Sequence, residues 1–149
     1  MNPIEMLKSD HDKVRALLTK LTDTTTAAIK TRQQLLEQIE NEMQVHTQLE
    51  EEIFYPAFKD AGGKEHDKMF FEAVEEHRAV QQLVMPDLKK SDPGSEQFSG
   101  RAKVLKELIE HHAGEEESEM FPAAQKAMSK EQLQEVGERM DKRKKELQK

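Results

Sequence analysis

The chain has 149 residues, of which 35% are hydrophobic and 36% are charged, and its formal net charge is −7. This length is typical of one compact domain with a substantial core. The acidic balance argues against nucleic-acid binding, which requires a basic face. The absence of cysteine excludes disulfides, thiolate metal sites and iron–sulfur clusters.

We expect a cytoplasmic protein, because a chain without cysteine fits a reducing compartment. No apolar run approaches the ~20 residues that a membrane-spanning helix needs. The first ten residues lack a charged segment followed by an apolar one, so no signal peptide and no membrane association are expected.

Apolar residues recur at helical spacing from the N-terminus onward. The first predicted helix begins near Pro3 and ends before the polar run 23–26. The second ends at Gly62 and Gly63, where glycine is expected to adopt the left-handed conformation of a helix end. The apolar stripes of these two helices are Ile4, Leu7, Val14, Leu18 and Leu21, then Leu36, Ile39, Met43, Ile53 and Ala57.

The third predicted helix runs to the turn cluster 91–95, and the fourth runs from there to about residue 128. Proline is expected to kink or stop a helix, and each of these two helices, like the second, contains one near its end. These prolines are Pro56, Pro86 and Pro122. Four helices with short connections predict an all-α, up-down-up-down four-helix bundle.

A fifth helix, over about 130–147, is predicted to begin at a capping box formed by Ser129 and Gln132. It should pack outside the bundle or on a partner subunit, so a homodimer through this helix is one expectation. The chain thus divides into a bundle, residues 1–128, and a C-terminal amphipathic helix, residues 129–149. The basic cluster 142–145 is interpreted mainly as favourable charge at a helix C-terminus.

An internal repeat with an offset of 66 residues relates the first pair of helices to the second pair. The matched pairs include His11 and His77, His46 and His112, Glu50 and Glu116, Glu51 and Glu117, Tyr55 and Phe121, and Pro56 and Pro122. The bundle is therefore expected to consist of two helical hairpins of similar design.

Each of the four bundle helices places a histidine on its apolar stripe, and two of them add a glutamate one turn later. These six residues are His11, His46, Glu50, His77, His112 and Glu116. An unpartnered buried polar group costs ~1–3 kcal/mol, and a buried carboxylate costs more. Six such groups at one depth therefore predict bound cations, and mixed imidazole and carboxylate ligands favour iron, then manganese, with zinc possible.

Other interpretations of these residues exist. One buried histidine is more often a hydrogen-bonded core residue, and two His-x-x-x-Glu pairs could be buried salt bridges. The shared repeat favours the metal site. His111 is an alternative ligand, although it points about 100° away from His112 around the helix.

Three further polar features receive weaker interpretations. Gln81, one turn after His77, could orient a ligand, whereas Tyr55 is expected to have a packing role. His66, beside the glycine turn, is expected to be solvated. The acidic run 115–117 is interpreted as a solvated face apart from Glu116.

Residues 3–128 resemble the hemerythrin-like superfamily, in its HHE cation-binding branch. The segments that carry the resemblance are His11-Asp12, residues 46–56, Glu76-His77-Arg78, residues 112–117 and Met120-Phe121-Pro122. The resemblance implies a non-haem di-iron centre, with two iron ions joined by an oxo or hydroxo bridge. It also implies which residues bind each ion: His11 and His46 one iron, His77 and His112 the other, with Glu50 and Glu116 bridging.

One position departs from the family's pattern. Oxygen-carrying hemerythrins have another histidine one turn before the third-helix ligand, and this chain has Ala73 there. The departure argues against reversible oxygen carriage and leaves more open coordination for O2, NO or peroxide. Glu72 could fill the gap, but its helical phase is poor.

Three functions follow from this reading. In the first, the centre binds or senses O2, NO or peroxide. In the second, it is an enzyme that reduces peroxide or NO, or oxidises ferrous iron, although no dedicated acid, base or substrate pocket is evident. In the third, the chain is a structural bundle, metal-free or binding zinc, whose fifth helix mediates association. His46→Ala would then change stability only modestly.

Overall fold

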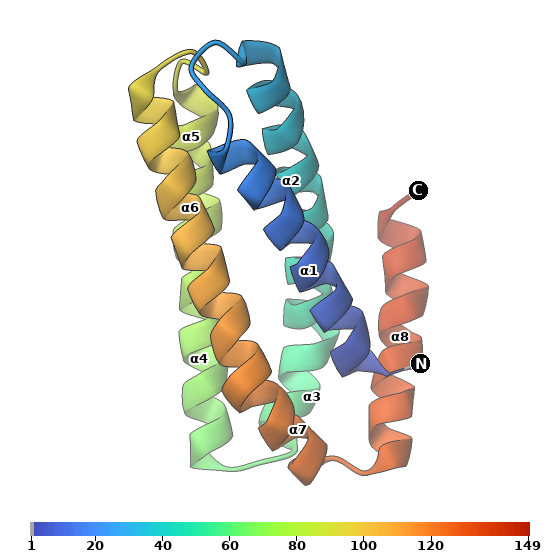
Figure 1. Cartoon of the computed structure of the whole chain (residues 1–149). Coiled ribbons are helices and arrows are strands. Elements are labelled where there is room, and N and C mark those ends of the chain that lie inside the picture. The colour runs from blue at the N-terminus through green and yellow to red at the C-terminus, as the bar shows by residue number, and fades with distance from the viewer. Residues whose placement is uncertain (1) are drawn as a thin grey trace.

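The computed structural model describes residues 2–149, and every regular element in that range is helical (Figure 1). The predicted all-α, up-down-up-down four-helix bundle with a C-terminal helix is confirmed. The first rod is α1 (Pro3–Thr22), and the second combines α2 (Ile29–Leu49), η1 (Glu50–Phe54) and α3 (Tyr55–Asp60). The third combines α4 (Lys64–Ala79), η2 (Val80–Val84) and α5 (Met85–Lys90). The fourth combines α6 (Glu96–Glu115), η3 (Glu116–Met120) and α7 (Phe121–Ala127), and α8 (Lys130–Leu147) follows.

The apolar core is divided into two clusters along the bundle axis. One cluster is made of residues such as Leu7, Phe54 and Phe121. The other includes Val14 and Phe98. On α1, His11 lies between Leu7 and Val14, so a polar layer separates the two clusters. This layer contains the predicted metal site.

The three internal prolines do not stop their helices, so of the two predicted effects, a kink or a stop, the structure excludes the stop. Each is the second residue of an α-helical segment that directly follows a five-residue π-helical segment, η1, η2 or η3. Proline cannot donate a backbone hydrogen bond, and its ring crowds the carbonyl four residues earlier. The π segments accommodate this, because the residue before each proline donates its N–H five residues back. Tyr55 thus donates to Glu50, Met85 to Val80 and Phe121 to Glu116.

The turn between α3 and α4 also differs from the prediction. No glycine in residues 2–149 has a positive φ angle, so Gly62 does not adopt the left-handed conformation. Glycine is needed there because a Cβ atom would lie 2.3 Å from the His66 ring. His66 is not simply solvated: its ring stacks on Phe58 at 4.0 Å, and its Nδ1–H donates to the Phe58 carbonyl at 2.7 Å.

The C-terminal helix α8 lies along the outside of the bundle beside α1 and α2 (Figure 1). It begins at the predicted capping box of Ser129 and Gln132, and it buries Val136 and Met140 in the same apolar cluster as Leu7. That apolar face is therefore covered by its own chain, and the homodimer stays a prediction. In the described range, no helix is both long and apolar enough to cross a membrane.

Candidate metal centre

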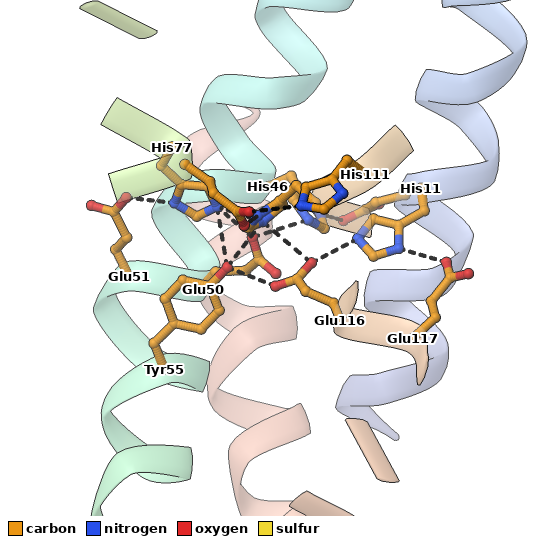
Figure 2. Close-up of polar contacts among 12 residues, drawn as sticks. His11, His46, Glu50, Glu51, Tyr55, His77, His111, Glu116 and Glu117 are labelled. Atoms are coloured by element: carbon orange, nitrogen blue, oxygen red, sulfur yellow. Dashed lines mark hydrogen bonds and ion pairs between the residues drawn. The ribbon is translucent and has the colours of Figure 1, made fainter. Parts of the chain in front are cut away.

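The structure brings all six predicted site residues together in the polar layer, and Figure 2 labels all of them except His112. The histidines come from the four rods, and the two glutamates are the first residues of η1 and η3. Five of the six residues are at most 8% exposed, and the sixth, His112, has a side chain that is 13% exposed. That these side chains ligate metal stays a prediction of the sequence.

The six side chains form two overlapping groups whose potential ligand atoms lie within 4.8 Å of one another. One group contains His11, His46, Glu50 and Glu116, and the other contains Glu50, His77 and His112. The ring centroids of His11 and His46 are 5.0 Å apart, and those of His77 and His112 are 4.7 Å apart. The imidazoles thus form two pairs, with Glu50 common to both groups.

Every one of the four imidazoles turns Nε2 towards the middle of the layer and Nδ1 outwards, where a carboxylate accepts the Nδ1–H. The four pairs are His11 with Glu117 at 2.7 Å, His46 with Asp10 at 3.0 Å, His77 with Glu51 at 2.6 Å and His112 with Glu76 at 2.6 Å. Such an outer carboxylate fixes the orientation and tautomer of a metal-binding histidine and raises its basicity.

These outer carboxylates were missed by the sequence analysis, although the repeat contained the signal. The offset of 66 residues relates Asp10 to Glu76 and Glu51 to Glu117, and all four are acidic. The prediction that Glu117 belongs to a solvated face was wrong, because Glu117 binds both His11 and Arg15. Gln81 does not orient a ligand: its side chain is exposed, and Glu51 occupies His77 Nδ1 instead.

Tyr55 is also part of the centre rather than only of the packing. Its hydroxyl donates to Glu116 Oε2 at 2.6 Å and lies 3.2 Å from Nε2 of both His77 and His112 (Figure 2). Its ring stacks on His77 at 5.3 Å, as the ring of its repeat partner Phe121 stacks on His11 at 5.9 Å. In their aromatic neighbours, the two halves of the centre therefore differ by one hydroxyl group.

Two buried polar atoms in this layer have no hydrogen-bond partner: His46 Nε2 and Glu50 Oε2. His46 Nε2 does lie 3.2 Å from Glu50 Oε1, but this contact does not satisfy hydrogen-bond geometry. Buried polar atoms are nearly always satisfied in folded proteins. Because His46 and Glu50 belong to one group of closely spaced potential ligands, a divalent cation is a suitable partner for such atoms.

Without a cation, protons on the buried histidines balance the negative charge of the buried glutamates. Burial alone would lower the pKa of His77, but hydrogen bonds to Glu50 and Glu51 outweigh it and raise that pKa to about 9. Burial is likewise outweighed at His46, chiefly by the charge of Glu50, and its pKa lies well above the usual value. The charge of His46 in turn holds the pKa of Glu50 well below its usual range despite burial. Cations must therefore displace protons to bind here.

The structure also shows where the alternative ligands on the third and fourth rods, Glu72 and His111, lie. His111 is 61% exposed and pairs with Glu115 at 3.0 Å and with Glu76 at 3.4 Å, so it lies outside the buried layer. Ala73 is buried, whereas Glu72 is exposed and does not fill the position that Ala73 leaves.

Two cavities reach the centre. One has a volume of about 40 Å³ and is lined by the four site histidines together with apolar residues that include Val14, Met43, Val80 and Ile109. The second is lined by Ala73, His112 and Glu116. Its other lining residues include four acids: Glu72, Glu76, Glu115 and Glu119. The centre is therefore accessible to small molecules through an apolar space and an acidic one.

Comparison with known proteins agrees with this geometry. The chain is 27% identical over 143 residues to the uncharacterized protein Rv2633c of Mycobacterium tuberculosis, a match that covers 94% of this chain and 83% of that protein. It is also 27% identical over 135 residues to a Nostoc protein named DNA nickase. That match covers 90% of this chain but only 36% of the relative, so the chain spans about a third of that protein's length.

A solved structure has the same fold: a hemerythrin HHE cation binding domain-containing protein from Mycobacterium kansasii, a homolog of Rv2633c. The two structures superpose with a TM-score of 0.84 at 26% sequence identity, covering 99% of this chain and 87% of the other. The family model described as "Hemerythrin HHE cation binding domain" matches residues 2–124. With its buried histidine and glutamate cluster, the chain belongs to the hemerythrin HHE cation binding domain family.

Proposed function

We propose that this protein binds two iron ions in the polar layer and that the resulting centre binds or senses O2, NO or peroxide. The observation that carries the proposal is the set of four buried imidazoles, each with Nδ1 held by a carboxylate and Nε2 facing two buried glutamates. This arrangement orients four imidazole nitrogens before any metal binds, and cations would bind them by displacing their protons.

The two overlapping groups support two cations. His11 and His46 would hold one, and His77 and His112 would hold the other, with Glu50 and Glu116 between them. Two carboxylates supply negative charge, and imidazole with carboxylate suits iron, with manganese or zinc as alternatives. Iron would supply reversible redox chemistry and open positions for a small ligand.

The two imidazole pairs have different surroundings, and the difference supports ligand binding on the side of His11 and His46. Tyr55 adds a phenol oxygen beside His77 and His112, where Ala73 contributes no donor. Phe121 offers no such oxygen beside His11. The small apolar cavity that contacts His46 favours an uncharged molecule of a few atoms over a charged substrate.

The test is elemental analysis of the purified protein together with its absorption spectrum. We expect about two iron ions per chain, and an absorption band that appears when the anaerobically reduced protein meets O2 and fades when O2 is removed. A protein without redox-active iron, or without any spectral response to O2, NO or peroxide, would contradict the proposal.

The acidic cavity supports a second candidate, an enzyme that reduces peroxide or NO or oxidises ferrous iron. These reductions consume protons, and Glu115 on the cavity rim has a raised pKa, because of burial and then its contacts with Glu72 and Glu76. Repeated turnover of peroxide or NO by the iron-loaded protein would favour this candidate, whereas one stoichiometric reaction per centre would favour binding.

A further inference from the structure

Asp10 joins the candidate metal centre to the C-terminal helix. One oxygen, Oδ2, accepts the Nδ1–H of His46 at 3.0 Å, and the other, Oδ1, accepts from Lys144 Nζ at 3.0 Å. Asp10 is only 4% exposed, so water cannot readily replace either partner. Lys144 comes from α8 and is separated from Asp10 by 134 positions in the sequence.

Lys144 lies outside the part of the chain that the family model describes. That model matches residues 2–124, and α8 begins at Lys130. Lys144 belongs to the basic cluster that the sequence analysis interpreted as general helix-end charge. The structure shows a more specific role for two of its members, because Arg143 binds Glu52 on the surface while Lys144 reaches the buried Asp10.

We propose that Lys144 is a positioning residue of the metal centre, which acts through Asp10 to hold His46 in its ligating orientation. A carboxylate buried with one unpaired oxygen is costly, and Asp10 without Lys144 would turn towards solvent. His46 would then lose the acceptor that fixes its ring. Nε2 of His46, which has no hydrogen-bond partner of its own, depends on that acceptor for its direction.

The repeat predicts that this effect is confined to one cation. Glu76 is the repeat partner of Asp10 and holds His112 in the same way. Its second oxygen faces the exposed His111 rather than a lysine from α8. Loss of Lys144 should therefore weaken the cation held by His11 and His46 and leave the one held by His77 and His112. This inference rests on the proposed binding of two cations.

The test compares three variants of the full chain: Lys144→Met, Lys144→Arg and Arg143→Met. Arg143→Met is the matched control, because it removes the other ion pair between α8 and the bundle without touching Asp10. Each metal-free protein is loaded anaerobically with Fe²⁺, and the iron is withdrawn by a competing chelator. Helix content and thermal unfolding of the metal-free proteins are recorded alongside.

We expect two cations per chain in the unmodified protein. In Lys144→Met one of them should bind roughly 10–100-fold more weakly, the usual effect of losing an outer partner of a metal ligand. Lys144→Arg should restore binding, and Arg143→Met should match the unmodified protein. If Lys144→Met does not fold, Lys144→Gln is judged by the same criteria.

Two results would overturn the inference: unchanged iron affinity in Lys144→Met, or an equal loss in Arg143→Met, which would mean that docking of α8 matters and Asp10 does not. If the unmodified protein itself binds fewer than two cations, the two-metal proposal has failed first. The two failures are thus distinguishable.

Discussion

At the scale of single residues, the two halves of the centre are alike in their imidazoles and different in their aromatic neighbours. Tyr55 donates its hydroxyl to Glu116 Oε2, whereas the equivalent oxygen of Glu50 has no partner. The repeat explains this difference, because the residue that corresponds to Tyr55 is Phe121. Phenylalanine cannot donate a hydrogen bond to Glu50 Oε2, and its ring stacks on His11.

Phe121→Tyr tests whether the small ligand binds beside this unpartnered oxygen of Glu50. The new hydroxyl should donate to Glu50 Oε2 and occupy the position beside that oxygen. We expect iron binding to persist and affinity for O2 or NO to fall by about tenfold, which corresponds to about 1.4 kcal/mol. The measurement is a spectroscopic ligand titration of the iron-loaded protein.

Tyr55→Phe is the reciprocal control for this substitution. Within residues 2–149, the hydroxyl that it removes is the only one hydrogen-bonded to the buried glutamates, and its loss should not weaken ligand binding on the His11 side. Equal ligand affinity in Phe121→Tyr and the unmodified protein would place the binding position elsewhere.

At the scale of secondary-structure elements, the π segments explain how Tyr55 reaches the centre. In an α-helix successive residues are about 100° apart, so Tyr55 would lie about 140° around the axis from Glu50. Within η1 the hydrogen bond spans five residues, from Tyr55 N–H to Glu50 O, and brings both side chains to the same face. Proline at position 56 sets the place of the π segment, because it supplies no N–H for the competing α-helical bond.

Pro56→Ala should allow the π segment to shift along the rod and turn Tyr55 away from Glu116. Tyr55 is the only tyrosine and the chain has no tryptophan, so near-ultraviolet circular dichroism reports on this side chain with little overlap from other residues. We expect its signal to change in Pro56→Ala, together with weaker iron binding.

Pro86→Ala provides the control, because Met85, the residue before it, belongs to an apolar cluster and to neither group of potential metal ligands. It should leave both the Tyr55 signal and iron affinity unchanged. An unaltered Tyr55 signal in Pro56→Ala would show that packing alone places the π segment.

At the scale of the whole molecule, protons and cations compete for the same buried histidines. Three of the four buried imidazoles have a raised pKa, because the acids around them outweigh the effect of burial. A cation must displace these protons, so iron affinity should rise with pH while the metal-free fold loses stability.

The sign follows from His77, whose pKa is 6.5 in the unfolded reference and about 9 in the fold. Its protonation stabilises the metal-free fold fully below pH 6.5, and that stability is lost as pH rises through about 9. We expect the free energy of unfolding to fall by roughly 2–3 kcal/mol across this range. Urea unfolding of the metal-free protein at each pH measures this free energy. In His77→Gln, the free energy of unfolding should depend less on pH. A metal-free protein whose stability rises over this range would contradict the assignment.

Much of the fold and of the site was predictable from the sequence. The 3.6-residue apolar period and the turn residues predicted the rods, and the polar residues on their stripes predicted which six side chains meet. The repeat also contained the outer acids Asp10, Glu51, Glu76 and Glu117. Their role was not predicted, because an acidic residue next to a buried apolar stripe has the same sequence pattern as an ordinary solvent-exposed residue.

The sequence by itself determined the four-helix bundle and its buried set of imidazoles and carboxylates, because helical periodicity is local and decides which residues face the core. Only the tertiary structure decided the position of Tyr55, whose direction depends on a π segment that breaks that period. The contact between Lys144 and Asp10 was likewise decided by the tertiary structure. It depends on how α8 docks against α1, and no local pattern relates residues 134 positions apart.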